Sequence, residues 1–181
     1  MCSSDRRILA VNANDEFPRF LGDGGYRPVS PSRACLSNAM NVGNPSNLAR
    51  YFDAYGGTVT REGAVRKAPD LAAMRAAMES VSIGDAETVA CIRDTWARRR
   101  VLLEPHGAVG VAALRRLGAG PGPSVCLETA HPAKFPEVIE RELGFAPEPP
   151  EAFRRLAERE PVVQRIPATY EALRETLTRN A

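Results

Sequence analysis

Two short runs of apolar residues constrain the fold of this chain most strongly. They lie at residues 7–12 (RILAVN) and 124–128 (SVCLE), and a further run at residues 162–166 could form another strand. Strands that are apolar at nearly every position are typical of parallel sheets buried on both faces. We therefore expect an α/β fold that is rich in helix, with a partial parallel sheet covered by helices.

Helical signals are much more numerous than strand signals. Apolar spacing, capping residues and initial prolines predict helices at residues 16–21, 45–55, 70–80, 85–98, 105–117, 132–143 and 170–178. Prolines between residues 147 and 150 predict a joint before the last elements. So few strands among so many helices indicate that another segment or chain supplies part of the sheet.

The length and the charge of the chain exclude several classes of protein. A chain of 181 residues favours one compact domain over residues 1–181. A net charge of +2 argues against a nucleic-acid-binding surface. No apolar stretch approaches the ~20 residues that span a bilayer, and residues 1–7 lack the apolar segment of a signal peptide. We expect a cytoplasmic protein that binds neither nucleic acid nor membranes.

The residues that usually bind metals are few and scattered. The four cysteines form no CxxC pair, and only two histidines accompany them, His106 and His131. This pattern predicts neither a metal site nor a disulfide framework. Lysine is also rare, because Lys67 and Lys134 are the only two among 24 basic residues. Chemistry that needs a lysine amine therefore has two candidates in this sequence.

A neutral polar stretch at residues 37–47 (SNAMNVGNPSN) is the first candidate site. Asn44 and Pro45 suit the N-cap and the first position of a helix, where free N–H groups favour a phosphate or a carboxylate. A purely structural interpretation is also open. In that case Asn44 caps the helix and the other side chains form turns.

The segment at residues 104–110 (EPHGAVG) is the second candidate. It couples Glu104 and His106 to the start of a helix whose first turns carry the small residues Gly107 and Gly110. His106 could carry a proton near neutral pH or orient a substrate, and the glycines would let the helix approach a flat ligand. Alternatively, Glu104 favours the helix N-terminus by its charge, His106 is exposed on the first turn, and the glycines serve helix packing.

The segment at residues 129–135 (TAHPAKF) is the third candidate, because it follows the predicted strand at residues 124–128. Ligands bind at this edge of open α/β sheets. The Thr129 hydroxyl can donate to or accept from a ring nitrogen, and His131 and Lys134 add donor groups. Lys134 could equally be a solvated side chain. Cys126 is expected to be a small buried strand residue rather than a nucleophile.

Taken in order, four segments of the chain resemble threonine synthase in its carboxyl-terminal portion. These segments are NAND with PRFL (residues 12–15 and 18–21), LSNAMNVGNPSN (36–47), EPHGAVG (104–110) and ETAHPAKF (128–135). The resemblance extends from about residue 7 to the end of the chain. Residues 58–100 resemble the family only in being helical.

The resemblance implies part of an enzyme that uses pyridoxal 5'-phosphate (PLP), of fold type II, the tryptophan-synthase-β type. Such an enzyme converts O-phospho-L-homoserine and water to L-threonine and phosphate. On the family pattern, Thr129 would lie beside the pyridine nitrogen of the cofactor. Glu104 and His106 would be catalytic residues close to a wall that meets the substrate. The wall would contain five residues of the polar stretch, which are Ser37, Asn38, Asn44, Ser46 and Asn47.

The sequence departs from the family in one important respect. The Schiff-base lysine of the family and its Gly-Asn-Phe-Gly type phosphate loop do not occur here, and neither Lys67 nor Lys134 is a credible replacement. We therefore expect catalysis to need an amino-terminal part, and we expect either that partner or self-association through an exposed sheet edge. The alternatives are a catalytically inactive domain that binds a small anionic amino acid or phosphate, and an RNA-contacting domain suggested by Arg98, Arg99 and Arg100.

Overall fold

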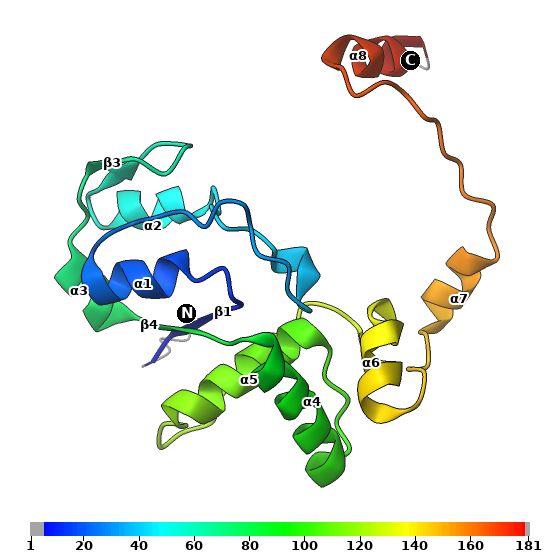
Figure 1. Ribbon diagram of the computed structural model, residues 1–181, viewed down its shortest axis with the longest axis horizontal. Helices are drawn as coiled ribbons and strands as arrows, with labels where there is room; N and C mark the ends of the chain where they lie inside the picture. Colours follow the sequence, from blue (N-terminus) through cyan, green and yellow to red (C-terminus); the bar gives the residue numbers. More distant parts are fainter. Residues whose placement is uncertain (1–5, 180–181) are drawn as a thin grey trace. The chain divides into compact units, whose positions relative to one another are not determined.

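The computed structural model describes residues 6–179 (Figure 1). The chain divides into two units, one up to Pro147 and the other from Glu148 onward. This division falls at the proline-rich joint that the sequence predicts. The prediction that residues 1–181 act as one domain stays a prediction.

The first unit is built around a pair of parallel strands. Strand β1 (Ile8–Val11) pairs with β4 (Glu79–Ser82), and Leu9 lies opposite Ser80. The chain between them forms three helices and a small antiparallel pair of strands, namely α1 (Glu16–Asp23), α2 (Leu48–Ala54), β2 (Thr58–Val59), β3 (Val65–Lys67) and α3 (Leu71–Ala77). The predicted parallel pairing and the helix-rich α/β class are confirmed.

Alternate residues of β1 pack against two different cores. Leu9 packs against a cluster from α1, α2 and α3 that we call the aromatic cluster, in which Phe20 and Phe52 stack with ring centroids 4.9 Å apart. Ile8 and Ala10 pack against the second cluster. Because successive side chains of a strand point to opposite faces, both faces of the strand pair are covered.

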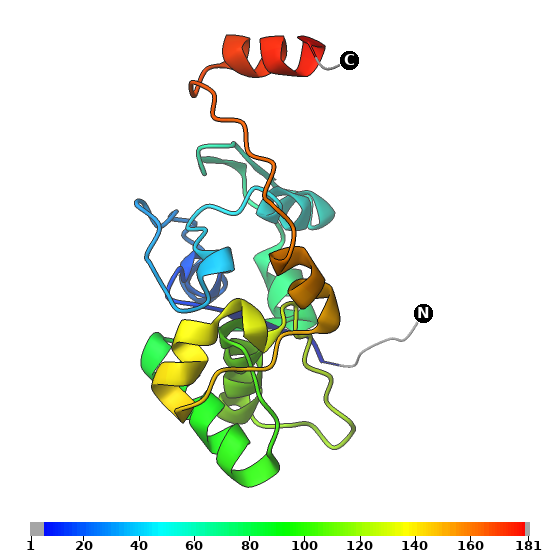
Figure 2. The same cartoon turned by 90° about the vertical axis from the view of Figure 1, so that its right-hand side faces the viewer.

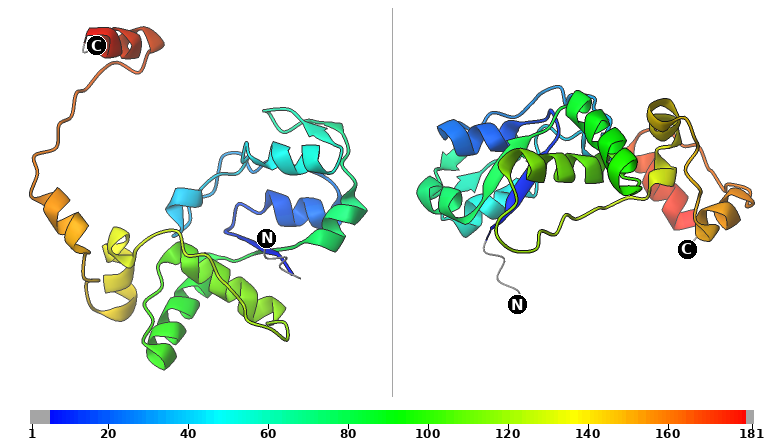
Figure 3. Two further views of the ribbon diagram at one scale, coloured as in Figure 1. Left: turned by 180° about the vertical axis from the view of Figure 1, so that it is seen from behind. Right: turned by 90° about the horizontal axis from the view of Figure 1, so that it is seen from below.

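The second cluster, which we call the helical cluster, comes from α4 (Asp85–Arg99), α5 (Pro105–Leu117) and α6 (Pro136–Leu143). Its central side chains include Ile92, Ala113 and Ile139, all fully buried. Figure 3 shows α4 and α5 side by side across the strands from α1. A short 3-10 turn, η2 (Pro132–Lys134), leads into α6.

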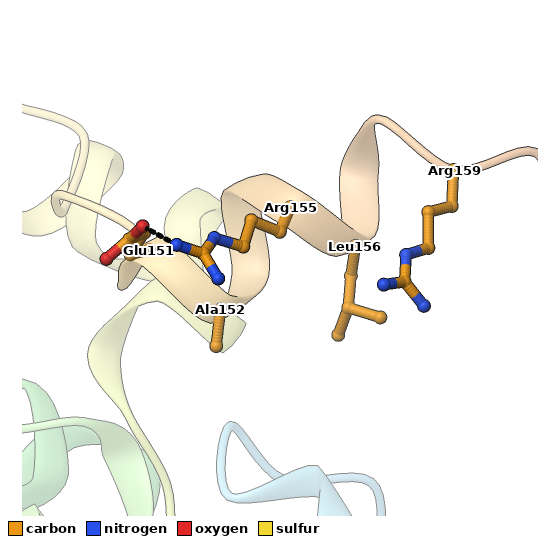
Figure 4. A pocket seen from close by; sticks show the side chains of 5 residues that line it. All are labelled: Glu151, Ala152, Arg155, Leu156 and Arg159. Atoms are coloured by element: carbon orange, nitrogen blue, oxygen red, sulfur yellow. Dashed lines mark hydrogen bonds and ion pairs between the residues drawn. The ribbon is translucent and has the colours of Figure 1, made fainter.

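The second unit contains α7 (Glu151–Ala157) and α8 (Tyr170–Arg179), joined by an extended segment (Figure 2). Neither helix has a buried residue. A shallow pocket on α7 is lined by side chains of that helix and its C-terminal end, including the Glu151–Arg155 ion pair (Figure 4). None of the predicted site residues lies there.

Two predicted strands are not strands in the structure. Residues 124–128 form no strand, and Val125 and Leu127 are 86% and 83% exposed. Residues 162–166 also form no strand. Because a strand is defined by its hydrogen-bonded neighbour, an apolar run alone does not produce one.

The middle of the chain also differs from the prediction. The helix expected over residues 70–80 ends at Ala77, and Met78 takes an extended conformation that leads into β4. Strands β2, β3 and β4 and helix α7 had no clear sequence signal. Helix α2 begins at Leu48 rather than at Pro45, because residues 45–47 form a turn in which the Leu48 N–H donates to the Pro45 carbonyl (3.0 Å).

Candidate functional site

The carboxyl end of β1 holds the polar stretch in place. Asn12 is buried, and its amide nitrogen donates to the hydroxyl of Ser37 (3.1 Å) and to the carbonyl of Met40 (3.1 Å). Its backbone carbonyl accepts from the hydroxyl of Ser82, at the end of β4 (2.8 Å). The polar stretch therefore lies at the edge of the sheet where ligands bind in parallel α/β folds.

A second buried amide, Asn14, completes this frame. Its nitrogen donates to the Asn12 side-chain oxygen (3.0 Å) and to the Arg33 carbonyl (3.0 Å), and its oxygen accepts from the Arg33 N–H (2.8 Å). Buried amides with their hydrogen bonds satisfied rigidify a loop. The sequence interpretation used both residues only for the family resemblance and took Asn14 with Asp15 as a helix-cap signal, without a role in holding the polar stretch. Asp15 is the N-cap of α1 but makes no side-chain capping bond. Two amides directly after a buried strand were the available signal.

The five predicted wall residues separate into two groups. Ser37 is buried under Asn12, and the amide of Asn44 accepts from the Tyr26 hydroxyl (2.9 Å) and donates to the Arg61 carbonyl (2.9 Å). Burial, helped by the charge of Glu16, raises the pKa of Tyr26 to about 12. Tyr26 therefore stays a protonated donor to Asn44. The other three predicted residues are exposed, and they are Asn38, Ser46 and Asn47.

A tight backbone approach holds the middle of the polar stretch. The Val29 N–H donates to the Gly43 carbonyl (2.8 Å), and a Cβ added at Gly43 would lie 2.0 Å from the Val29 oxygen. Only glycine fits there without movement of the backbone. Asn44 does not cap α2, since the N-cap of that helix is Asn47, which makes no side-chain capping bond. The prediction that Asn44 caps the helix, which the structural interpretation shares, is therefore wrong. Anion binding by the polar stretch stays a prediction.

The start of α5 forms a buried carboxylate–imidazole pair. Glu104 is fully buried, and its carboxylate accepts from the backbone N–H groups of His106 (2.8 Å) and Gly107 (2.6 Å). It also lies 2.5 Å from Nδ1 of His106, whose side chain is only 7% exposed. Glu104 thus caps the helix N-terminus by hydrogen bonds, and the same carboxylate orients the imidazole. The structural interpretation expected His106 to be exposed on the first turn, and this part of it is wrong.

The other ring nitrogen of His106 has no partner. Nε2 is buried and makes no hydrogen bond within the described residues. With Nδ1 donating to Glu104, Nε2 carries the lone pair of the neutral ring. An acceptor in such a position is poised for a donor that the described residues do not supply.

The TAHPAKF segment contacts this pair at both of its ends. Before Thr129, the carboxylate of Glu128 accepts from the Glu104 backbone N–H (3.1 Å). After it, the ring of Phe135 lies 5.1 Å from the His106 ring, centroid to centroid. The structure thus brings the second and third candidate segments together.

The polar side chains between these two contacts are exposed. Thr129, His131 and Lys134 all have exposed side chains, and Nδ1 of His131 accepts from the Ala133 N–H (3.1 Å). Gly107 and Gly110 of α5 face Glu128 and Cys126, so the small residues serve close packing against this segment. Burial raises the pKa of the Cys126 thiol, which fits the expectation that it is no nucleophile.

Metal ligands, membrane-spanning helices and the arginine triplet give no further candidate site within the described residues. No group of three or more metal-ligating side chains occurs within residues 6–179, and no helix in that range is long and apolar enough to cross a membrane. The arginine triplet ends α4, where Arg98 pairs with Asp94 (2.5 Å) and Arg100 lies over the ring of Trp96. This arrangement matches a helix end rather than a nucleic-acid surface.

Comparisons with known proteins agree on one family. A family model described as threonine synthase, C-terminal, matches residues 107–177. The threonine synthases of Corynebacterium glutamicum and Escherichia coli are 33% and 34% identical to this chain over 94% and 95% of its length. The chain spans only 39% and 37% of the length of these relatives.

Solved structures give the same result. The crystal structure of threonine synthase from Escherichia coli matches 98% of this chain with a TM-score of 0.75 at 30% identity, and 38% of that protein is covered. The PLP-bound threonine synthase from Brucella melitensis matches 86% of this chain with a TM-score of 0.76 at 30% identity, and 36% of it is covered.

These matches define the class of protein first. The helix-covered parallel strands match part of the fold of the threonine synthases, which are PLP enzymes of fold type II. More particularly, the chain corresponds in sequence and fold to the carboxyl-terminal portion of the threonine synthases.

Proposed function

We propose that this chain supplies the carboxyl-terminal part of a threonine synthase active site. The proposed reaction converts O-phospho-L-homoserine and water to L-threonine and phosphate, and it needs an amino-terminal part. The buried Glu104–His106 pair carries this proposal, because its unpartnered Nε2 lies on a segment shared with the family. A buried polar atom without a partner is costly unless a ligand or partner uses it.

The residues present fit one side of PLP but not its covalent anchor. When bound, PLP supplies an electron sink for carbanions next to the amino group of the substrate. Thr129 would hold the pyridine nitrogen through its exposed hydroxyl, on the segment that contacts the pair at both ends. Both Lys67 and Lys134 are exposed and stand outside any lysine motif of the family. We assign the Schiff-base lysine to the amino-terminal part.

The pair would hold and move a proton at Nε2 of His106. The Glu104 carboxylate accepts a hydrogen bond from the Nδ1–H group and so favours the tautomer in which Nε2 is the acceptor. If Nε2 takes a proton from substrate or water, the same carboxylate stabilises the imidazolium. Burial keeps bulk water away from the ring and strengthens both interactions.

The exposed rim of the polar stretch would meet the substrate. Asn38, Ser46 and Asn47 present neutral hydrogen-bonding groups that suit a phosphate or carboxylate. Ser37 and Asn44 would act from behind, because their side chains are engaged in holding the loop. Of the five wall residues, two would therefore hold the loop in place and three would contact the substrate.

The proposed partner is an amino-terminal part that completes the sheet. Residues 124–128 have a strand-like sequence but form no strand, and the apolar side chains of Val125 and Leu127 are exposed. Exposed extended edges pair with other strands. Light scattering on the chain alone should show self-association, and an added amino-terminal part should replace it with a one-to-one complex. A monomer that ignores the added part would contradict this.

A chimera tests the proposed reaction. This chain replaces the corresponding carboxyl-terminal part of the Escherichia coli enzyme, and phosphate release from O-phospho-L-homoserine is measured with PLP. We expect turnover in the chimera, its loss in His106→Ala and Thr129→Ala variants, and full turnover in Glu140→Ala, an exposed position on α6. A folded chimera that does not turn over, while the chain alone binds phosphate, would favour the inactive binding domain instead.

A further inference from the structure

We propose that Glu128 is a positioning residue, which couples the Thr129 segment to the Glu104–His106 pair. This inference rests on the proposed function for its purpose, but its geometry stands on the structure alone. The carboxylate of Glu128 accepts from the backbone N–H of Glu104 (3.1 Å), across 24 positions of sequence. Glu128 directly precedes Thr129 in the chain.

The contact between Glu128 and the start of α5 depends on glycines of that helix, which have no side chain to collide with it. A Cβ added at Gly107 would lie 2.7 Å from Oε1 of Glu128 and 2.8 Å from its Cγ. One turn further along α5, a Cβ at Gly110 would lie 2.5 Å from the sulfur of Cys126. Two glycines on one face of the helix thus seat alternate residues of the segment before Thr129.

The bond reaches the imidazole through a single residue. Glu128 holds the backbone of Glu104, and the side chain of Glu104 holds Nδ1 of His106. Glu104 is also the N-cap of α5, where the backbone conformation sets the direction of the side chain. Loss of the Glu128 acceptor should therefore change the direction in which the Glu104 carboxylate points. It should also release the segment that carries Thr129 from α5.

Histidine NMR on the full chain tests the coupling directly. Because the chain has only two histidines, the ring-nitrogen spectrum is simple, and a His131→Gln variant assigns the His106 signals. In the unmodified chain at mildly alkaline pH we expect one dominant tautomer, with the proton on Nδ1. We also expect slow hydrogen exchange at the Glu104 amide.

Three variants separate positioning from general structure. Glu128→Ala should mix the His106 tautomers and speed exchange at the Glu104 amide. Glu128→Gln keeps an acceptor oxygen and should restore both signals, and Glu140→Ala should change neither. The proposal is overturned if Glu128→Ala leaves the His106 signals unchanged, or if Glu128→Gln behaves like Glu128→Ala.

A Gly107→Ala variant approaches the same contact from the helix side. Its added Cβ should displace the Glu128 carboxylate and reproduce the Glu128→Ala spectrum, although alanine favours the helix. In a double variant with Glu128→Ala, Gly107→Ala should add little, because the side chain that it displaces is gone. Additive effects would overturn the proposal. If Glu128→Ala does not fold, the Gly107→Ala single variant decides, because mixed His106 tautomers support the coupling and unchanged His106 signals overturn it.

Kinetics in the chimera supply the functional readout. Glu128→Ala should lower kcat by about tenfold or more through misplacement of the pair, with KM changed by less than about twofold. If Glu128→Ala mixes the His106 tautomers but leaves kcat normal, the coupling has no role in catalysis. If the chimera is inactive while the NMR effects occur, the proposed function fails and the coupling stands.

Discussion

The start of α5 and the polar stretch at residues 37–47 are both polar segments that lead into a helix, yet the structure treats them in opposite ways. At α5 the carboxylate and the imidazole are buried, and Nε2 of His106 has no hydrogen-bond partner among residues 6–179. The polar stretch has a buried frame of Asn12 and Asn14 under an exposed rim. The difference supports the proposal that the buried pair takes part in the reaction while the exposed rim meets the substrate.

Local helix signals explain part of this contrast. Helix α5 has 13 residues, a side-chain N-cap and a proline at its start, so its first turn is well defined. Helix α2 has seven residues and no side-chain cap bond. The order of the polar stretch therefore comes from tertiary hydrogen bonds rather than from its own helix.

The largest effect should come from removal of the buried carboxylate at α5. Glu104→Ala removes the helix cap and leaves Nδ1 of His106 and two N–H groups unpaired, so unfolding free energy should fall by about 3 kcal/mol. Urea unfolding measures it, and Glu104→Gln should lose less because an acceptor remains. A loss below about 1 kcal/mol would show that the pair is not prearranged.

Gly43→Ala tests whether the polar stretch is equally well held at its centre. The new Cβ meets the backbone of Val29, so we expect a loss of about 2 kcal/mol in unfolding free energy. Gly22→Ala on α1 is the matched control, since nothing lies within 4 Å of its Cβ and alanine favours the helix. Equal stability of the two variants would mean that the loop yields freely.

Glu16 carries another buried atom that, like Nε2 of His106, has no hydrogen-bond partner among the described residues. Its Oε2 is buried without a partner among the described residues, and burial raises the pKa of its carboxyl. Because the folded state binds this proton more tightly, the protonated form adds stability at low pH, and that stability is lost as pH rises through the raised pKa. No ligand is proposed for Glu16 Oε2, in contrast to Nε2 of His106, so we expect this buried oxygen only to lower the stability of the fold.

Glu16→Gln should therefore stabilise the chain by about 1 kcal/mol at neutral pH and have almost no effect in acid. Thermal unfolding at a series of pH values measures the difference, with Glu140→Ala as an exposed control. A gain that is equal at all pH values would show that the charge of Glu16 is not its cause.

The smallest effect on stability should come from the exposed rim. Asn38→Ala and Asn47→Ala should change unfolding free energy by less than about 0.5 kcal/mol, because both side chains are exposed. In the chimera they should nevertheless raise KM for O-phospho-L-homoserine. Asn44→Ala is the reverse control and should cost stability, since it loses its bonds to Tyr26 and Arg61. Unchanged KM in both rim variants would remove the rim from recognition.

Much of the fold could be predicted from local signals. Strand β1 and helices α4, α5 and α8 were predicted within a residue or two, because their caps, prolines and apolar spacing act over short distances. Strand β4 was missed, since its short and largely polar sequence becomes a strand only through pairing with β1. Residues 124–128 fail in the opposite way, with a strand-like sequence and no neighbour to pair with.

The sequence by itself determined the family resemblance, the helix-rich parallel class and the three polar segments, because motifs and periodicity are local properties. Only the tertiary structure decided which polar atoms are used up in holding the chain. It buried Ser37 and engaged Asn44, exposed Asn47, and joined Glu128 to Glu104. The physical reason is that burial and hydrogen bonding depend on which distant segments meet, and spacing along the chain does not contain that information.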